Sequence, residues 1–290
     1  MYIGSLGKKT IKIFAVLSLA LTALAVILRT VCLAFFYDEL NEGVGYFTKG
    51  VLPTLFTVLC FMSVILFFLA ALISKKVCCV SDGKEDNVAL KIVSACAMLG
   101  FASFFVGTIS TMEFVNLSTV FDLLVKISSL MAIIYFAMNI FGVETVKAVQ
   151  VVLGFGIVVW TVCILAITYF NINVPMNSPE KTYLHLALVA LMVFFVSEFR
   201  SFLVKINKPL YVFTLSCAVF FSGVETVPSL IKFFSLGMAD YDYLYYDIVI
   251  FTLFLYVTVR LVSFAFFIDT RKKAEELSAV ENSDETENEV

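Results

Sequence analysis

Three ionisable residues inside apolar segments are the part of this sequence that could carry chemistry. Arg29, Lys126 and Glu225 each lie within a long run of apolar residues. A charged side chain at the centre of a bilayer costs about 2.5 to 3.5 kcal/mol on insertion scales, so such residues usually face the bundle interior, form pairs or reach an interface. We therefore take these three as candidate ligand-binding residues lining an outward-facing polar pocket. A structural ion pair is the alternative that the same residues allow.

Glu225 has the most informative neighbours, because Gly223 precedes it and Pro228 follows it. A glycine and a proline around an acid favour a broken helix, whose freed backbone groups and carboxylate face a polar cavity. Alternatively, the span ends before Pro228, Glu225 lies at the outer interface, and Pro228 begins an interfacial helix. The sequence leaves both interpretations open.

The five residues GVETV occur at 142–146 and again at 223–227. A true duplication would place other helices on helices at the same offset, and it does not, so the match indicates no repeat. In the first copy, Gly142 is expected to end a helix, because glycine is the usual residue just after a helix C-terminus.

Catalytic and metal-binding patterns are not found in this sequence. It contains one histidine, and it shows no H-E-x-x-H, G-x-S-x-G or P-loop motif. The seven cysteines show no C-x-x-C spacing. We therefore predict a protein that is not an enzyme and that uses no cofactor or metal. The lack of a basic patch argues against nucleic acid as a partner.

Composition identifies the elements that must position the candidate residues. The chain has 290 residues, of which 61% are hydrophobic and only 15% are charged, well above the apolar content of a soluble domain. A helix of roughly 20 apolar residues crosses a bilayer, and several runs reach that length. Backbone groups in lipid must be satisfied internally, so the expected fold class is all-α, a polytopic transmembrane helical bundle in contact with the lipid bilayer.

Eight spans are predicted from the apolar runs and from the loops rich in Gly, Pro, Asn, Asp and Ser that separate them. They run from Lys12 to Phe36, Val51 to Ser74, Leu90 to Ile109, Val120 to Phe141, Ala148 to Tyr169, Tyr183 to Val204, Leu210 to Phe234 and Tyr245 to Phe267. The first segment also resembles a secretory signal ending at Ala23 to Ala25, but apolar residues continue beyond that point, which favours an uncleaved helix.

Most lysines and arginines fall on one side of this arrangement. They lie at the N-terminus, in the loops that follow the second, fourth and sixth spans, and at the C-terminal end. Since basic residues prefer the cytoplasmic side, the predicted orientation is N-in and C-in, in a multi-pass protein of the cell membrane. Glu198, Arg200 and Arg260 then lie near cytoplasmic helix ends, where we expect them to anchor the bundle at the headgroups.

Two regions follow from the change in composition near the C-terminus. Residues 1–268 form the predicted transmembrane helical domain. Residues 269–290 begin with a basic cluster and continue as an acidic, aromatic-free tail, which predicts a disordered cytoplasmic segment. The tail is either a docking site for a cytoplasmic partner or a solubilising end.

The loop after the first span carries a further pattern in RTVCLAFFYDELNEGVGYFTKGVLPTL, from Arg29 to Leu55. This stretch resembles one found near the N-terminus of uncharacterised multi-spanning membrane proteins of clostridia-type bacteria. The resemblance implies a membrane fold and no known activity. Read from its residues, the loop is a compact outer turn that contains Asp38, Tyr46 and Phe47, and it is a candidate lid over the pocket.

These observations predict a membrane protein that transports or senses a small molecule through an outward-facing polar cavity. The competing prediction is a non-catalytic structural or regulatory subunit that contacts a cytoplasmic partner. The two differ in whether Arg29, Lys126 and Glu225 converge on a water-accessible site.

Overall fold

A computed structural model describes residues 3–41, 44–74, 88–109, 117–142, 147–171, 175, 178–203, 208–236 and 244–266. Eight long helices account for almost all of these residues, and each is long and apolar enough to cross a membrane. The chain is therefore an all-α, multi-pass membrane protein, and the prediction of eight spans is confirmed. The helices are α1 (Ile3–Phe35), α2 (Val51–Ser74), α3 (Val88–Ile109), α4 (Leu117–Phe141), α5 (Lys147–Phe170), α6 (Pro179–Leu203), α7 (Lys208–Leu236) and α8 (Leu244–Phe266).

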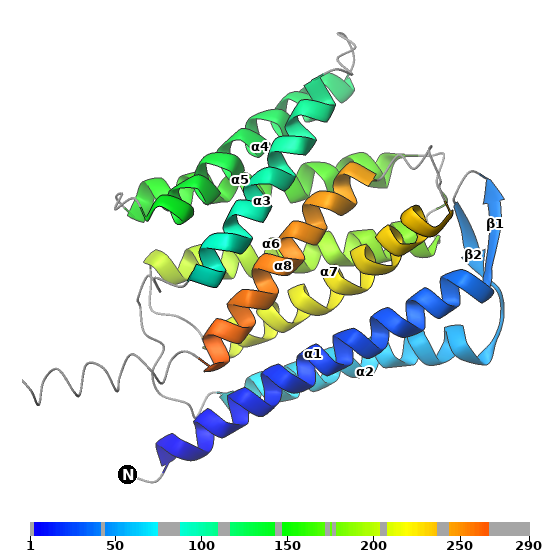
Figure 1. Ribbon diagram of the computed structural model, residues 1–290, viewed down its shortest axis with the longest axis horizontal. Coiled ribbons are helices and arrows are strands. Elements are labelled where there is room, and N and C mark those ends of the chain that lie inside the picture. Colours follow the sequence, from blue (N-terminus) through cyan, green and yellow to red (C-terminus); the bar gives the residue numbers. More distant parts are fainter. Residues whose placement is uncertain are drawn as a thin grey trace, which may run out of the picture.

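Successive helices run up and down the bundle, so the start of α1 and the end of α8 lie at the same end (Figure 1). The opposite end carries a short antiparallel hairpin of β1 (Tyr37–Asn41) and β2 (Val44–Phe47). The orientation of this bundle in the membrane stays a prediction, and the acidic tail lies outside the described residues.

Helix α7 is the central helix. It packs against α1, α2, α6 and α8, and α3 to α5 complete the bundle through contacts of α3 with α8 and of α5 with α6 (Figure 1). In its apolar window 83% of the residues are buried, against 28% to 50% in the other helices. A helix with so little lipid contact can carry polar residues on several faces, and α7 contains serines, threonines and Glu225.

The outer helices instead present apolar stripes to the lipid. On α2, the exposed large side chains recur with helical spacing on one face, at Val58, Phe61, Ile65, Phe68 and Leu72. Residues three and four apart share a helix face. These exposed apolar side chains therefore form the surface that contacts the lipid.

Two glycines show how the sequence shapes these elements. Gly142 follows the last residue of α4 with φ of 63°, the left-handed conformation that glycine adopts at low cost, so its predicted role as a helix end is confirmed. At Gly223 a Cβ atom would lie 2.9 Å from Cγ2 of Thr22 on α1 and 2.8 Å from a ring carbon of Phe254 on α8. Gly223 therefore permits the close approach of α1, α7 and α8.

Replacing Gly223 by leucine should force α1 and α8 away from α7. Overpacking of this kind typically costs about 1 to 3 kcal/mol, so we expect Gly223→Leu to lower the Tm of the detergent-solubilised protein. Ala20→Leu adds bulk on the exposed face of α1 and should change the stability by no more than about 0.5 kcal/mol. Equal Tm values for the two variants would contradict this account of the helix contact.

Candidate functional site

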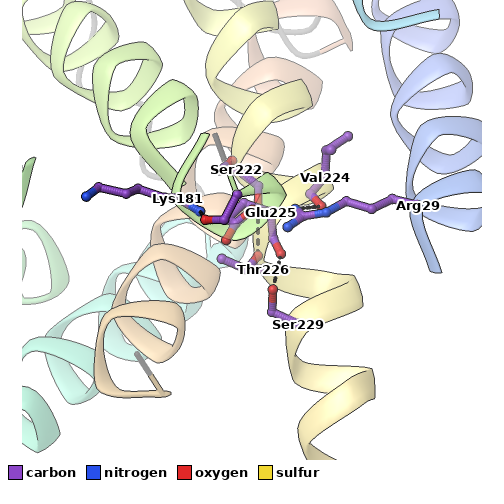
Figure 2. Close-up of polar contacts among 8 residues, drawn as sticks. Arg29, Lys181, Ser222, Val224, Glu225, Thr226 and Ser229 are labelled. Atoms are coloured by element: carbon purple, nitrogen blue, oxygen red, sulfur yellow. Dashed lines mark hydrogen bonds and ion pairs between the residues drawn. The ribbon is translucent and has the colours of Figure 1, made fainter. Parts of the chain in front are cut away.

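The buried contact between α1 and α7 brings together two of the three candidate ligand-binding residues. Arg29 has no exposed surface and Glu225 is 1% exposed. The Arg29 Nη1 group donates one hydrogen bond to Oε2 of Glu225 and another, 2.6 Å long, to the backbone carbonyl of Val224 (Figure 2). A single guanidinium nitrogen thus binds both a side chain and the backbone of α7.

The reason that the Val224 carbonyl is available lies four residues further along the chain. In an α-helix this carbonyl would accept a hydrogen bond from the N–H of residue 228, but residue 228 is a proline, which has no N–H. Arg29 supplies the missing donor. A carbonyl without a partner inside a membrane bundle would be costly, so the side chain of α1 compensates for the proline in α7.

Neither sequence interpretation of the Glu225 segment is correct. The segment is not broken, because α7 continues as one helix from Lys208 to Leu236 through Pro228. It also does not end early with Glu225 at the interface, because Glu225 is buried in the bundle.

Two hydroxyl groups also bond to the α7 backbone here: Thr226 donates to the Ser222 carbonyl and Ser229 to the Glu225 carbonyl, both at 2.8 Å.

Helix α6 closes one side of this contact. The Arg29 guanidinium carbon lies 4.9 Å from the ring centroid of Tyr183, within the range of a cation–π interaction. Tyr183 in turn packs on Phe56 of α2, and Phe56 packs on Phe47 of the hairpin, with ring centroids 5.2 and 6.4 Å apart. The hairpin is thus joined to Arg29 through a chain of aromatic rings.

The hairpin replaces the compact turn that we expected around Asp38, Tyr46 and Phe47. Asp38 pairs with Tyr46 across the two strands, and its side chain lies outside the described part of the chain. Tyr46 is exposed, and Phe47 is half-buried against Tyr37 and Phe56. Of the three, Phe47 is the residue linked to the buried site.

Glu180, which sequence reasoning missed, is a second buried acid in this region. It is 7% exposed and lies in the first turn of α6. Neither of its carboxylate oxygens accepts a hydrogen bond within the described part of the chain. Its charge interacts with Arg29 and Lys232, and the Tyr37 hydroxyl lies nearby. Ser178 and Pro179 are a helix-start signal that could have placed Glu180 inside the span.

Arg29 also has groups that remain without partners. Its Nε and Nη2 atoms are buried and donate no hydrogen bond to any described residue. Together, Arg29, Glu180, Tyr183, Val224 and Glu225 form what we call the Arg29 cluster. It offers two unused donor groups and one unused carboxylate, which are complementary to a small polar molecule.

Lys126, the third candidate, does not join this cluster. Its ammonium group lies 2.7 Å from Oδ2 of Asp122, one turn earlier on α4, so the pair is local. Helix α4 packs against α3 and α5, whereas the Arg29 cluster is built from α1, α6 and α7. The i, i+4 spacing is a sufficient reason for this pairing. Of the three candidates, the structure brings Arg29 and Glu225 together and leaves Lys126 apart from them.

Lys181 follows Glu180 but has a structural role. Its Nζ atom donates to the carbonyl of Tyr169 at 3.1 Å and to that of Asn171 at 2.9 Å. These are carbonyls at the C-terminal end of α5, which lack helical partners. In Figure 2 the Lys181 side chain points away from Arg29 and Glu225, so it caps α5 and leaves Glu180 uncompensated.

Another buried acid lies toward the other end of the bundle. Glu198 on α6 has no exposed surface and accepts hydrogen bonds from Nε of Arg260 at 2.9 Å and from the Tyr211 hydroxyl at 2.6 Å. This network joins α6, α7 and α8. The expected headgroup anchors are therefore corrected for Glu198 and Arg260, while Arg200 is exposed. Its described donors and acceptors are paired, unlike those of the Arg29 cluster.

Removing Arg29 should leave both the Glu225 carboxylate and the Val224 carbonyl buried without a donor. Breaking a buried ion pair by removing one partner typically costs about 3 to 5 kcal/mol, which is the loss that we expect for Arg29→Met in detergent unfolding. Adding Glu225→Met should recover much of it. The control Lys126→Met breaks a pair whose acid is 43% exposed and should cost at most about 1 kcal/mol. Similar losses for both single variants would rule out the assigned role of Arg29.

The Pro228→Ala variant tests why Arg29 is bound to the backbone. Alanine restores the N–H that the Val224 carbonyl lacks, so Arg29→Met should cost about 1 kcal/mol less in the Pro228→Ala background, the usual net worth of a hydrogen bond. Pro53 lies in the first turn of α2, where no intrahelical hydrogen bond is lost. Pro53→Ala and Arg29→Met should therefore be additive. If the effects of Pro228→Ala and Arg29→Met are also additive, Arg29 does not replace the hydrogen bond that Pro228 removes.

No family model, curated protein or solved structure matches this chain. Within the described residues, no group of three His, Cys, Asp or Glu side chains is placed to hold a metal ion. The resemblance at Arg29 to Leu55 stays a prediction.

Proposed function

We propose that this protein transports or senses a small polar molecule and that the Arg29 cluster is its binding site. One observation supports this most strongly: Arg29 is completely buried and leaves its Nε and Nη2 groups without partners, beside a buried Glu180 whose oxygens are also unpartnered. Leaving a buried polar group unsatisfied costs about 1 to 3 kcal/mol. A ligand that accepts from Arg29 and donates to Glu180 would remove that cost.

The orientation in this proposal comes from the lysine and arginine distribution, which assigns the termini to the cytoplasm of a cell-membrane protein. The hairpin end, and with it the Arg29 cluster, then faces outward. Catalysis is not part of the proposal, since the cluster contains no paired nucleophile and base.

The competing function is a structural or regulatory membrane subunit that binds a cytoplasmic partner through its acidic tail. What favours it is the contact already made by Arg29, which joins α1 to α7 and is covered by Tyr183. In that case the cluster is a closed structural joint and small molecules have no access to it.

Thiol accessibility separates the two functions. On a background without the native cysteines, we expect Ser229→Cys to react with an impermeant thiol reagent, because Ser229 bonds to the Glu225 carbonyl beside the site. The rate should lie between that of Ser235→Cys at the exposed end of α7 and that of Ser128→Cys in the core of α4. If Ser229→Cys is as inert as Ser128→Cys while the protein stays folded, the structural function is preferred.

A further inference from the structure

The Arg29 cluster contains more acidic than basic groups. Arg29 pairs with Glu225, so the second acid, Glu180, has no ion pair among the described residues. Both of its oxygens are buried and accept no hydrogen bond there. An isolated carboxylate in an apolar interior is very costly unless it is neutralised.

The charged and titratable groups that act on Glu180 come from α1, β1 and α7, and none of them forms an ion pair with it among the described residues. They are Arg29 on α1, Tyr37 on β1, and Glu225 and Lys232 on α7. The Lys232 ammonium group lies 4.2 Å from the Tyr37 ring centroid, and Arg29 is bound to Glu225 and Val224. Neither cation donates a hydrogen bond to the Glu180 oxygens.

We propose that Glu180 is a proton-binding site that holds an exchangeable proton at neutral pH. A proton taken up from water converts the carboxylate into a neutral carboxyl group and needs no further ligands. A metal cation is a poorer match, because hard cations require several oxygen ligands and the neighbouring Glu225 carboxylate is already bound to Arg29.

The state of Glu180 controls Arg29. When Glu180 loses its proton, its carboxylate competes with Glu225 for the guanidinium, whose Nε and Nη2 groups are unused. Movement of Arg29 toward Glu180 withdraws the donor from the Val224 carbonyl and leaves α7 uncompensated at Pro228. Proton release is thereby coupled to bending of the central helix. This coupling role rests on the proposed transport or sensing function, whereas proton binding itself does not.

Infrared spectroscopy of the full-length protein in lipid detects the proton directly. At about pH 7, where carboxyl groups in water are ionised, the wild-type protein should show the C=O stretch of a protonated carboxyl group, shifted in D2O. Glu180→Gln should lose this band. Asp122→Asn, which removes the half-exposed partner of Lys126, should keep it. A wild-type protein without the band, or a band that persists in Glu180→Gln, overturns the proposal.

Two further measurements use the wild-type protein, so they do not depend on the folding of a variant. Dicyclohexylcarbodiimide, which modifies protonated carboxyl groups in apolar surroundings, should modify Glu180, as mapped by mass spectrometry; modification at Glu225 alone contradicts the assignment. Sodium ions added at constant pH should leave the infrared band unchanged. If sodium ions abolish the band, Glu180 binds a metal cation instead. If the spectra show a proton at Glu180 but Ser229→Cys does not react with the thiol reagent, the proposed function is rejected and the proton site is kept.

Discussion

The hydrogen bond from Arg29 to the Val224 carbonyl is the interaction on which the hairpin-side half of the bundle depends. Pro228 deprives α7 of one backbone donor inside the helical bundle, where an unpaired carbonyl is costly. The replacement comes from another helix, so the continuity of α7 depends on the position of α1. Gly223 makes this geometry feasible, because it lets Thr22 and Phe254 approach the α7 backbone directly.

Buried polar contacts tie α7 to its neighbours toward both ends. On one side Arg29 and Glu225 join α1 to α7, and on the other Glu198 receives hydrogen bonds from Arg260 of α8 and Tyr211 of α7. Between apolar helices in lipid the hydrophobic effect does not choose partners. Directional polar contacts can choose them, which explains why the most buried helix carries so many polar residues.

The two contacts nevertheless differ in a way that bears on function. The Glu198 network uses its described donors and acceptors, whereas the Arg29 cluster leaves two donor groups and the Glu180 carboxylate unused. Each unsatisfied buried group lowers stability, and the Arg29 cluster gathers several of them in one place. These unused polar groups lie beside a helix that lacks one backbone hydrogen bond at Pro228, and this combination is the basis of the proposed binding site.

The sequence by itself determined the features that depend on residues near one another in the chain. Apolar length is sufficient for the eight spans, and one glycine for the end of α4 at Gly142. It also indicated that Arg29 and Glu225 must face the bundle interior, form pairs or reach an interface. Only the tertiary structure decided that these two residues, 196 positions apart, bind each other, that Lys126 stays with its own helix, and that Glu180 joins the cluster. The physical reason is that a side chain's partner on another helix depends on how all the helices pack, and neither hydropathy nor spacing along one chain segment contains that information.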